Sequence, residues 1–319
     1  MNEQHSYHYT RRDAIRLGIG FAISPLLMSS QFQKISGSIS MVGNQLEKRP
    51  IPASGEMIPV VGLGTWRVFD VGNSQPRRAG LLEVMKTLNA KGASVIDSSP
   101  MYGSSETVVG DLSQQLNIRN KLFLATKVWT SGREDGIEQM NQSFQKMKAT
   151  KMDLMQVHNL VDVQTHLQTL RKWKDEGRIR YIGITHYLPS AYPEMVRLIK
   201  NEKLDFIQCC YNIETRDAEK ELLPLAKDKG VAVIINRPFQ EGALFNRVEG
   251  RAIPEWAKDY SINSWAQFFL KFILAHPAVT CSIPGTSNAM HLAENLGAAD
   301  SNLPDSKARE KMVKEFSNY

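Results

Sequence analysis

The sequence predicts an α/β protein built as a parallel (β/α)8 TIM barrel that is preceded by a short β-hairpin. From residue 46 onward, short apolar runs of strand length alternate with longer stretches of helical periodicity. There are eight such runs, the number that closes this barrel, and 319 residues leave room for its usual size of about 250. The composition is globular, with 42% apolar and 23% charged residues.

Residues 1–45 differ from the rest and resemble a twin-arginine (Tat) signal peptide followed by a linker. Arg11 and Arg12 precede an apolar stretch, Leu17–Met28, which is too short to span a hydrocarbon core of about 30 Å. The resemblance implies a partner, the Tat export machinery, and a periplasmic or other extracytoplasmic location. The alternatives are an amphipathic N-terminal helix and a cytoplasmic protein.

Residues 46–319 are predicted to form the barrel domain. It begins with a hairpin, in which 48–52 and 57–59 are joined by a Ser54-Gly55 turn. Buried parallel strands read as continuous apolar runs, and each run is short enough for one strand. The eight predicted strands are 60–63, 94–96, 122–126, 153–157, 181–185, 206–210, 232–235 and 280–283.

Helices are predicted between the strands, because apolar residues recur there at intervals of three and four. Such stripes cover residues 137–147, 163–173 and 262–273. Residues 240–260 form an insertion between the seventh and eighth strands. Glycine favours the left-handed conformation that ends many helices. The predicted helix stops are Gly92, Gly177 and Gly230.

Several other classes of protein fit the sequence poorly. A doubly wound sheet would carry Gly-x-Gly-x-x-Gly before a helix, but residues 62–64 lack the third glycine. The net charge of +6 is scattered, without basic runs interleaved with aromatics, so no nucleic-acid partner is expected. The thiols of Cys209, Cys210 and Cys281 have neither disulfide-framework nor metal spacing, and we expect buried free thiols.

Polar side chains follow three consecutive predicted strands. Asp97 ends the second run, Lys127 the third and His158 the fourth, and Tyr102 lies one short loop beyond Asp97. In a parallel barrel the chemistry sits at the strand ends, and neighbouring strands lie about 4.8 Å apart. We therefore expect the four side chains to converge.

These four groups suit proton donation to an oxygen that gains negative charge as its carbon gains hydride. Tyrosine has a pKa of about 10, and a nearby lysine cation is expected to lower it. Asp97 would keep Lys127 charged, and His158 would donate a hydrogen bond to a carbonyl oxygen. Singly, the three could be a helix cap, a solvated loop lysine and a core histidine, but their common placement favours the functional interpretation.

Seven segments around these residues carry a family resemblance. They are residues 60–66, 96–103 with Glu106, 125–127, 157–159, 182–185, Gln208 with 211–212, and 283–286 with 294–295. Over roughly residues 50–300 the chain resembles the aldo-keto reductase family. The resemblance implies NAD(P)H-dependent reduction of small-molecule aldehydes or ketones to alcohols. It also implies a catalytic tetrad of Asp97, Tyr102, Lys127 and His158, with Tyr102 as the acid.

The resemblance further implies the residues that bind the cofactor. Thr185 and His186 stand where the family usually has Ser-Asn, and residues 240–244 would hold the pyrophosphate. Gly285 and His291 replace basic residues with which many members grip the extra ribose phosphate. NADPH is favoured, but because of these two replacements NADH stays open. The implied set is Gly64, Thr65, Trp66, Asp97, Thr185, Gln208, Arg237, Phe239, Gly285, Thr286, Ser287, His291, Glu294 and Asn295.

Trp66, Trp129 and Tyr187 follow strand ends and are predicted to line the substrate pocket. Two rival functions stay open. One is a non-enzymatic dinucleotide-binding sensor or partner subunit on the same barrel. The other is a metal hydrolase, although no metal ligands are expected, because the first strand lacks the His-x-His typical of that class. The sequence carries no signal for an oligomeric state.

Overall fold

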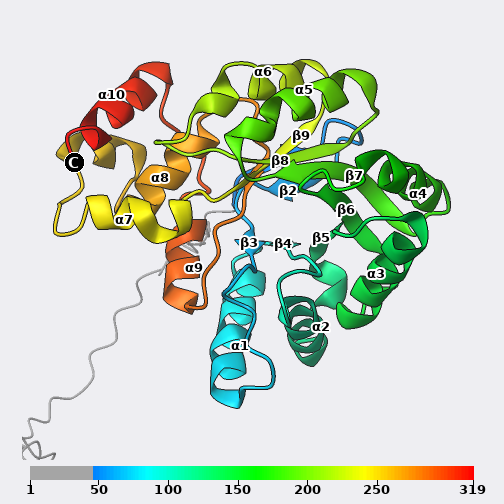
Figure 1. Cartoon of the computed structure of the whole chain (residues 1–319). Helices are drawn as coiled ribbons and strands as arrows, with labels where there is room; N and C mark the ends of the chain where they lie inside the picture. The colour runs from blue at the N-terminus through cyan, green and yellow to red at the C-terminus, as the bar shows by residue number, and fades with distance from the viewer. Residues whose placement is uncertain (1–45) are drawn as a thin grey trace, which may run out of the picture. The chain divides into compact units, whose positions relative to one another are not determined.

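The structure, a computed structural model, describes residues 46–319, and the predicted signal and linker lie outside this range. In the described part, a barrel of parallel strands is surrounded by helices (Figure 1). The predicted hairpin is confirmed as the antiparallel pair β1 (Lys48–Pro50) and β2 (Met57–Pro59). The barrel strands are β3 (Leu63–Gly64), β4 (Val95–Asp97), β5 (Phe123–Val128), β6 (Met152–His158), β7 (Ile179–His186), β8 (Phe206–Cys210), β9 (Ala232–Asn236) and β10 (Cys281–Ser282).

The first and last strands close the barrel. Strands β3 to β10 pair in sequence order, and the remaining edge is joined by parallel bridges between Val61 and Ser282 and between Gly64 and Gly285. The Gly62 N–H donates to the Ser282 carbonyl over 2.9 Å. Residues 60–62 therefore pair with β10 before β3 starts to pair with β4 at Leu63. This closure confirms the barrel and excludes the doubly wound sheet.

Gly64 is required by this close approach of the two chain segments. A Cβ at this position would lie 2.7 Å from the Ile283 carbonyl oxygen, a distance that real Cβ atoms essentially never show. The contact holds the β3 end against the segment that leads out of β10. A side chain here would therefore push apart the two strands that close the barrel.

The helices cover the outside of the barrel (Figure 1). Gly92, Gly177 and Gly230 follow helices with φ of +77°, +73° and +65°, which confirms the predicted left-handed stops. The helices are α1 (Gln75–Ala90), α2 (Ser105–Gln115), α3 (Arg133–Lys146), α4 (Val163–Asp175), α5 (Tyr192–Asn201), α6 (Leu222–Asp228), α7 (Ala243–Arg247), α8 (Trp265–Leu274), α9 (Ala289–Leu296) and α10 (Ser306–Phe316). Short 3-10 turns are η1 (Arg119–Lys121), η2 (Pro189–Ala191), η3 (Asp217–Glu219), η4 (Gln240–Gly242) and η5 (Glu255–Tyr260).

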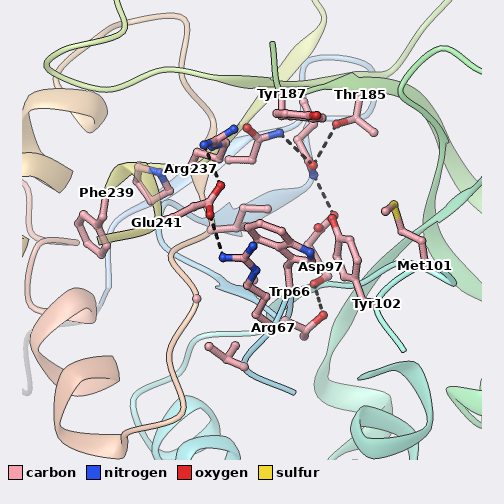
Figure 2. Close-up of a pocket in the computed structure, with 18 of the residues that line it drawn as sticks. Trp66, Arg67, Asp97, Met101, Tyr102, Thr185, Tyr187, Arg237, Phe239 and Glu241 are labelled. Carbon is pink, nitrogen blue, oxygen red and sulfur yellow. Dashed lines mark hydrogen bonds and ion pairs between the residues drawn. The ribbon is translucent and has the colours of Figure 1, made fainter. Parts of the chain in front are cut away.

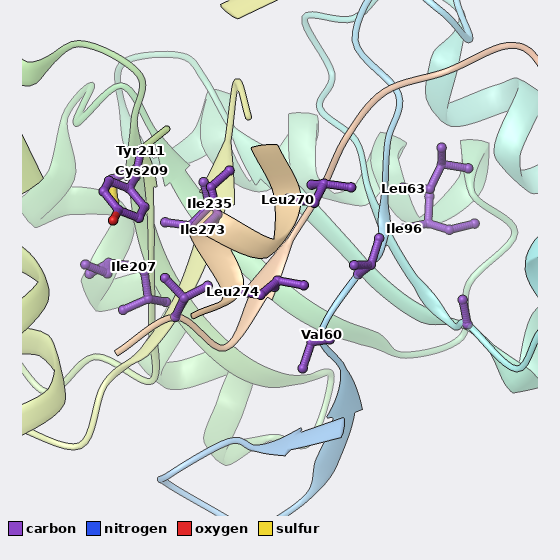
Figure 3. Packing of buried hydrophobic residues seen from close by; sticks show 14 of the residues in the cluster. Val60, Leu63, Ile96, Ile207, Cys209, Tyr211, Ile235, Leu270, Ile273 and Leu274 are labelled. Atoms are coloured by element: carbon purple, nitrogen blue, oxygen red, sulfur yellow. The ribbon is translucent and has the colours of Figure 1, made fainter. Parts of the chain in front are cut away.

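The larger apolar core lies between the strands and the helices. Figure 3 shows a part of it in which Ile273 of α8 lies beside Ile235 of β9. These side chains are fully buried, and their strand and helix periodicities place them on facing surfaces. Apolar burial of this extent is the main force that holds the helices on the barrel.

A second apolar cluster fills the inside of the barrel. It alternates along each strand with the residues of the outer core, as the two-residue period of a strand requires. Ile51 and Ile58 flank the hairpin turn. They close the lower end of this cluster, which is the end at the amino termini of the strands. The other members are Val95, Phe123, Ala125, Leu154, Tyr181, Phe206, Ala232, Ile234, Cys281 and Ile283.

Between residues 46 and 319, no helix is both long and apolar enough to cross a membrane. Within the same range, no group of three or more His, Cys, Asp or Glu side chains is placed to hold a metal ion. Cys209, Cys210 and Cys281 are buried free thiols, as predicted.

Candidate active site

A cavity of about 660 Å³ opens at the carboxyl ends of the barrel strands. It is lined by residues from the segments that follow most of the strands (Figure 2). The floor carries polar groups of the inner strand positions, and the rim carries aromatic and charged side chains. A cavity with a few convergent polar groups at this end of a barrel is the expected place for an active site.

Asp97 and Lys127 form a buried ion pair beneath the cavity. Lys127 Nζ donates to Asp97 Oδ2 over 2.6 Å and to the Ser98 carbonyl over 2.6 Å. The Lys127 side chain is 0% exposed and the Asp97 side chain is 3% exposed. Burial alone would lower the pKa of Lys127, but the neighbouring Asp97 carboxylate and Tyr102 raise it above its usual value. Lys127 therefore stays a cation, as the sequence predicted.

Tyr102 lies above this pair, in the turn that leads to α2. The Lys127 ammonium is 5.0 Å from the centroid of its ring, and the His158 ring meets it edge-on at 5.9 Å. Burial raises the pKa of Tyr102 above its ordinary value, although the Lys127 cation acts to lower it. The lysine acts in the predicted direction, but desolvation outweighs it, so the pKa of Tyr102 is raised overall. The phenol keeps its proton at neutral pH.

His158 ends β6 and presents a neutral imidazole. Burial, assisted by the Lys127 cation and by His186, lowers the pKa of His158 to about 2. Its Nδ1 lies 3.0 Å from the hydroxyl oxygen of Ser99, and the Trp129 ring is 6.4 Å away between centroids. A neutral imidazole can donate one hydrogen bond without adding a positive charge to the site.

Asp97 is also the acceptor for two amides that extend the polar layer. Gln208 Nε2 donates to Asp97 Oδ1 over 2.8 Å, and Gln156 Nε2 approaches the same oxygen at 3.3 Å. The side-chain oxygen Oε1 of Gln208 accepts from Thr185 Oγ1 over 3.0 Å. Sequence reasoning missed Gln156, although it lies two residues before His158 and so shares its inward face.

The structure brings most of the predicted cofactor residues to the cavity, but not all of them. Those that line it are Gly64, Thr65, Trp66, Asp97, Thr185, Gln208, Arg237, Phe239 and Gly285. Thr286, Ser287, His291, Glu294 and Asn295 do not line it. They lie in and before α9, where Asn295 is buried and His291 is exposed. The Asn288 side chain caps this helix by accepting from the Met290 N–H over 2.8 Å.

An ion-pair bridge at the rim was not predicted from the sequence. Glu241 pairs with Arg67 over 3.0 Å and with Arg237 over 2.7 Å, which connects the loops after β3 and β9 (Figure 2). Arg67, Arg237 and Glu241 all have positive φ, of 62°, 50° and 57°. Such left-handed turns leave no clear signal in a sequence without glycine or asparagine at these positions. Glu241 belongs to the 240–244 segment that was predicted to hold a pyrophosphate.

The aromatic residues predicted for the substrate pocket lie at the rim. Trp66, Trp129 and Tyr187 line the cavity and are about two-fifths exposed. The sequence did not single out Met101, which joins them with an exposed fraction of 38%. The Arg237 guanidinium stacks over the Tyr187 ring at 5.3 Å. An apolar rim above a polar floor suits a small molecule that buries its polar end.

Comparisons with known proteins agree with this geometry. Residues 60–312 match the model of the Aldo/keto reductase family. The methylglyoxal reductase YeaE of Escherichia coli strain K12 is 26% identical over 267 residues, covering 81% of this chain and 92% of that protein. An NADH-specific methylglyoxal reductase of the same organism is 25% identical over 258 residues, covering 72% of this chain and 78% of that protein.

A solved structure has the same fold. An aldo/keto reductase from Klebsiella pneumoniae, in complex with NADP and acetate, superimposes with a TM-score of 0.72 at 21% identity. The match covers 85% of this chain and 96% of that chain. The family match covers most of the barrel and the cavity that opens from it. The chain therefore belongs to the aldo/keto reductase family, and it is an NAD(P)H-dependent oxidoreductase.

Proposed function

We propose that this oxidoreductase reduces small aldehydes or ketones to alcohols, with Tyr102 as the general acid. One observation carries the proposal. At the floor of the cavity, the Tyr102 ring lies 5.0 Å from a buried ammonium and 5.9 Å from a neutral imidazole. Because burial raises the pKa of Tyr102, the phenol holds a proton until a substrate oxygen develops negative charge.

Each neighbour of Tyr102 has a role in this proton transfer. His158 donates a hydrogen bond that orients the carbonyl oxygen and stabilises the charge growing on it. As Tyr102 releases its proton, the Lys127 cation stabilises the phenolate, and Asp97 keeps that cation charged. The proton goes to the oxygen of the new alcohol.

The residues at the cavity fit a nicotinamide dinucleotide. Two of them hold buried polar atoms that have no partner within the described chain, namely Asn236 Oδ1, an acceptor, and Arg237 Nε, a donor. An acceptor suits the carboxamide of a nicotinamide, and a guanidinium donor suits a phosphate. When bound, the dinucleotide supplies the hydride that reduces the carbonyl carbon.

NADPH is the proposed cofactor, and NADH is the alternative. The Klebsiella structure was solved with NADP, whereas one E. coli relative is named as NADH-specific. Ser287 and His291, both in the predicted cofactor-binding set, are exposed near the start of α9, where they are accessible to a ribose phosphate. The substrate class includes 2-oxoaldehydes, since two relatives are named methylglyoxal reductases.

A fluorescence titration of the purified protein with NADPH and NADH, followed by a carbonyl panel, tests these proposals. The panel includes methylglyoxal, an aromatic aldehyde and a ketone, and loss of nicotinamide absorbance reports turnover. We expect NADPH to bind more tightly than NADH and to support reduction. Binding without turnover of any carbonyl would favour the sensor function, and absence of binding would overturn both.

We also propose that the protein is exported through the Tat machinery to a periplasmic or other extracytoplasmic location. The Arg11-Arg12 pair and the short apolar stretch after it support this. In a fractionation experiment, replacing both arginines by lysine should leave the protein in the cytoplasm. Replacement of Lys34 by arginine, in the linker, serves as the matched control and should not affect export. Unchanged fractionation of the double variant would refute the signal.

A further inference from the structure

Ser99 contacts both halves of the proposed acid site. It is fully buried in the turn between β4 and α2. Its hydroxyl oxygen lies 3.0 Å from Nδ1 of His158, and its backbone carbonyl accepts from the Tyr102 N–H over 3.0 Å. One residue outside the predicted tetrad therefore holds the imidazole and the turn that carries the phenol.

The groups around the Ser99 hydroxyl determine which atom donates in the Ser99–His158 hydrogen bond. A neutral imidazole has one N–H and one bare nitrogen, and a hydroxyl has one proton to donate. The Ser99 oxygen faces the Met101 N–H at 3.5 Å, where it can only accept. Among the residues of the described chain, His158 Nδ1 is the acceptor within reach of the Ser99 proton. A buried hydroxyl that donated to nothing would be costly.

We propose that Ser99 is a positioning residue that donates to Nδ1 of His158 and so fixes the imidazole as its Nε2–H tautomer. The proton on Nε2 is then available to a substrate oxygen. This inference rests on the proposed carbonyl reduction, because only an oxygen acceptor in the cavity makes the choice of tautomer matter. With the opposite tautomer, a lone pair of Nε2 would face the lone pairs of the carbonyl oxygen.

The expected kinetic effect follows from the loss of one neutral hydrogen bond. In Ser99→Ala the imidazole loses the partner that selects its tautomer, and kcat/KM should fall by about fivefold. Most of the fall should be in kcat rather than KM, because the hydrogen bond from Nε2 strengthens as charge develops on the oxygen. If the serine only filled space, Ser99→Ala would change the stability of the protein without lowering kcat more than it changes KM.

The decisive measurement is nitrogen-15 NMR of the histidine side chains in the full chain. Protonated and bare ring nitrogens differ widely in shift, so the spectrum reports the tautomer without any turnover. His158 is assigned by the signal that disappears in His158→Gln. Wild type should show a protonated Nε2 and an accepting Nδ1, and Ser99→Ala should shift toward a mixture of tautomers.

Ser113→Ala is the matched control. This buried α2 serine donates to the Gly110 carbonyl over 3.1 Å and does not line the cavity. Its loss should leave the His158 signals and kcat unchanged. A protonated Nδ1 in the wild-type protein would overturn the inference even if Ser99→Ala did not fold, and so would an unchanged His158 spectrum in a folded Ser99→Ala. The correct tautomer in a protein that reduces no carbonyl would refute the proposed function alone.

Discussion

The two ends of the barrel interior are built from the same strands but contain opposite kinds of side chain. At the lower end, Val95, Phe123 and Phe206 pack with the residues of the hairpin in a dry apolar cluster. At the upper end, two or four residues further along the same strands, stand Asp97, Lys127 and Gln208. Every one of these positions points inward, because side chains alternate with a period of two.

This contrast separates what holds the barrel together from what gives it chemistry. The lower cluster gains its stability from buried apolar area. The upper layer buries a charge pair, the amides of Gln156 and Gln208, and the imidazole of His158. Removing such groups from water costs free energy. The arrangement of this layer is consistent with a proton-donating site, and variants at the two ends should therefore differ in what they damage.

The largest effect is expected for Lys127→Met, at the upper end. Removing the ammonium leaves the Asp97 carboxylate buried without its partner, which should cost about 3–5 kcal/mol of unfolding free energy. Turnover should be lost as well. Denaturant unfolding measures the first effect, and Lys86→Met, which removes an exposed pair with Glu83, is the control with less than about 1 kcal/mol. Equal costs in the two variants would contradict the contrast.

Tyr102→Phe should damage function alone. Without its hydroxyl the site loses the proposed acid, and kcat should fall by about 10³-fold. Cofactor affinity and thermal midpoint should stay close to wild type, because the ring and its packing remain. Steady-state kinetics and the fluorescence titration measure these. Tyr319→Phe, at a partly buried tyrosine that does not line the cavity, is the control. Retained turnover in Tyr102→Phe would show that another group donates the proton.

Phe206→Ala should have the reverse effect. Its ring packs against Tyr181 and Phe123, at 5.5 Å and 6.1 Å between centroids, in the lower cluster. The cavity left behind should cost about 3 kcal/mol of unfolding free energy. The folded fraction should keep its kcat and KM, measured at a temperature where the variant is native. A large change in KM would mean that the two ends are coupled.

The smallest effect is a pH dependence of stability that originates at the upper end. Folded His158 has a pKa of about 2, against 6.5 when unfolded, so below pH 6.5 only the unfolded chain takes up this proton. Its contribution to stability is therefore full above pH 6.5 and decreases as the pH falls. Between pH 7 and 5 it should decrease by about 2 kcal/mol. Denaturant unfolding at several pH values should show a shallower dependence in His158→Gln, and parallel curves would refute the assignment.

The fold was largely predictable because apolar runs and capping glycines are local signals. The first strand was predicted at residues 60–63; the structure has β3 at Leu63–Gly64, and residues 60–62 bond to β10. The convergence of Asp97, Lys127 and His158 was also predictable, since strand ends meet at one edge. Their catalytic roles stay predictions until the variants are measured.

Features that depend on three-dimensional surroundings were not predictable. The pKa of Tyr102 depends on how deeply the ring is buried, which no residue pattern reveals. The bridge from Arg67 to Glu241 depends on left-handed turns in two loops far apart in the chain. The positions of Ser287 and His291 relative to the cavity follow from the path of the chain into α9.

The shared orientation of the inner residues has a consequence for assembly. A slip of one residue in the pairing of β4, β5, β6 or β8 would turn its polar side chain out among the helices and swing an apolar one into the mouth. Such a misaligned barrel would bury a charge or an amide among apolar side chains without a hydrogen-bond partner, which is costly in free energy. The polar upper layer therefore favours the correct strand register. Chains that finish folding are those in which the acid and its neighbours already face one another.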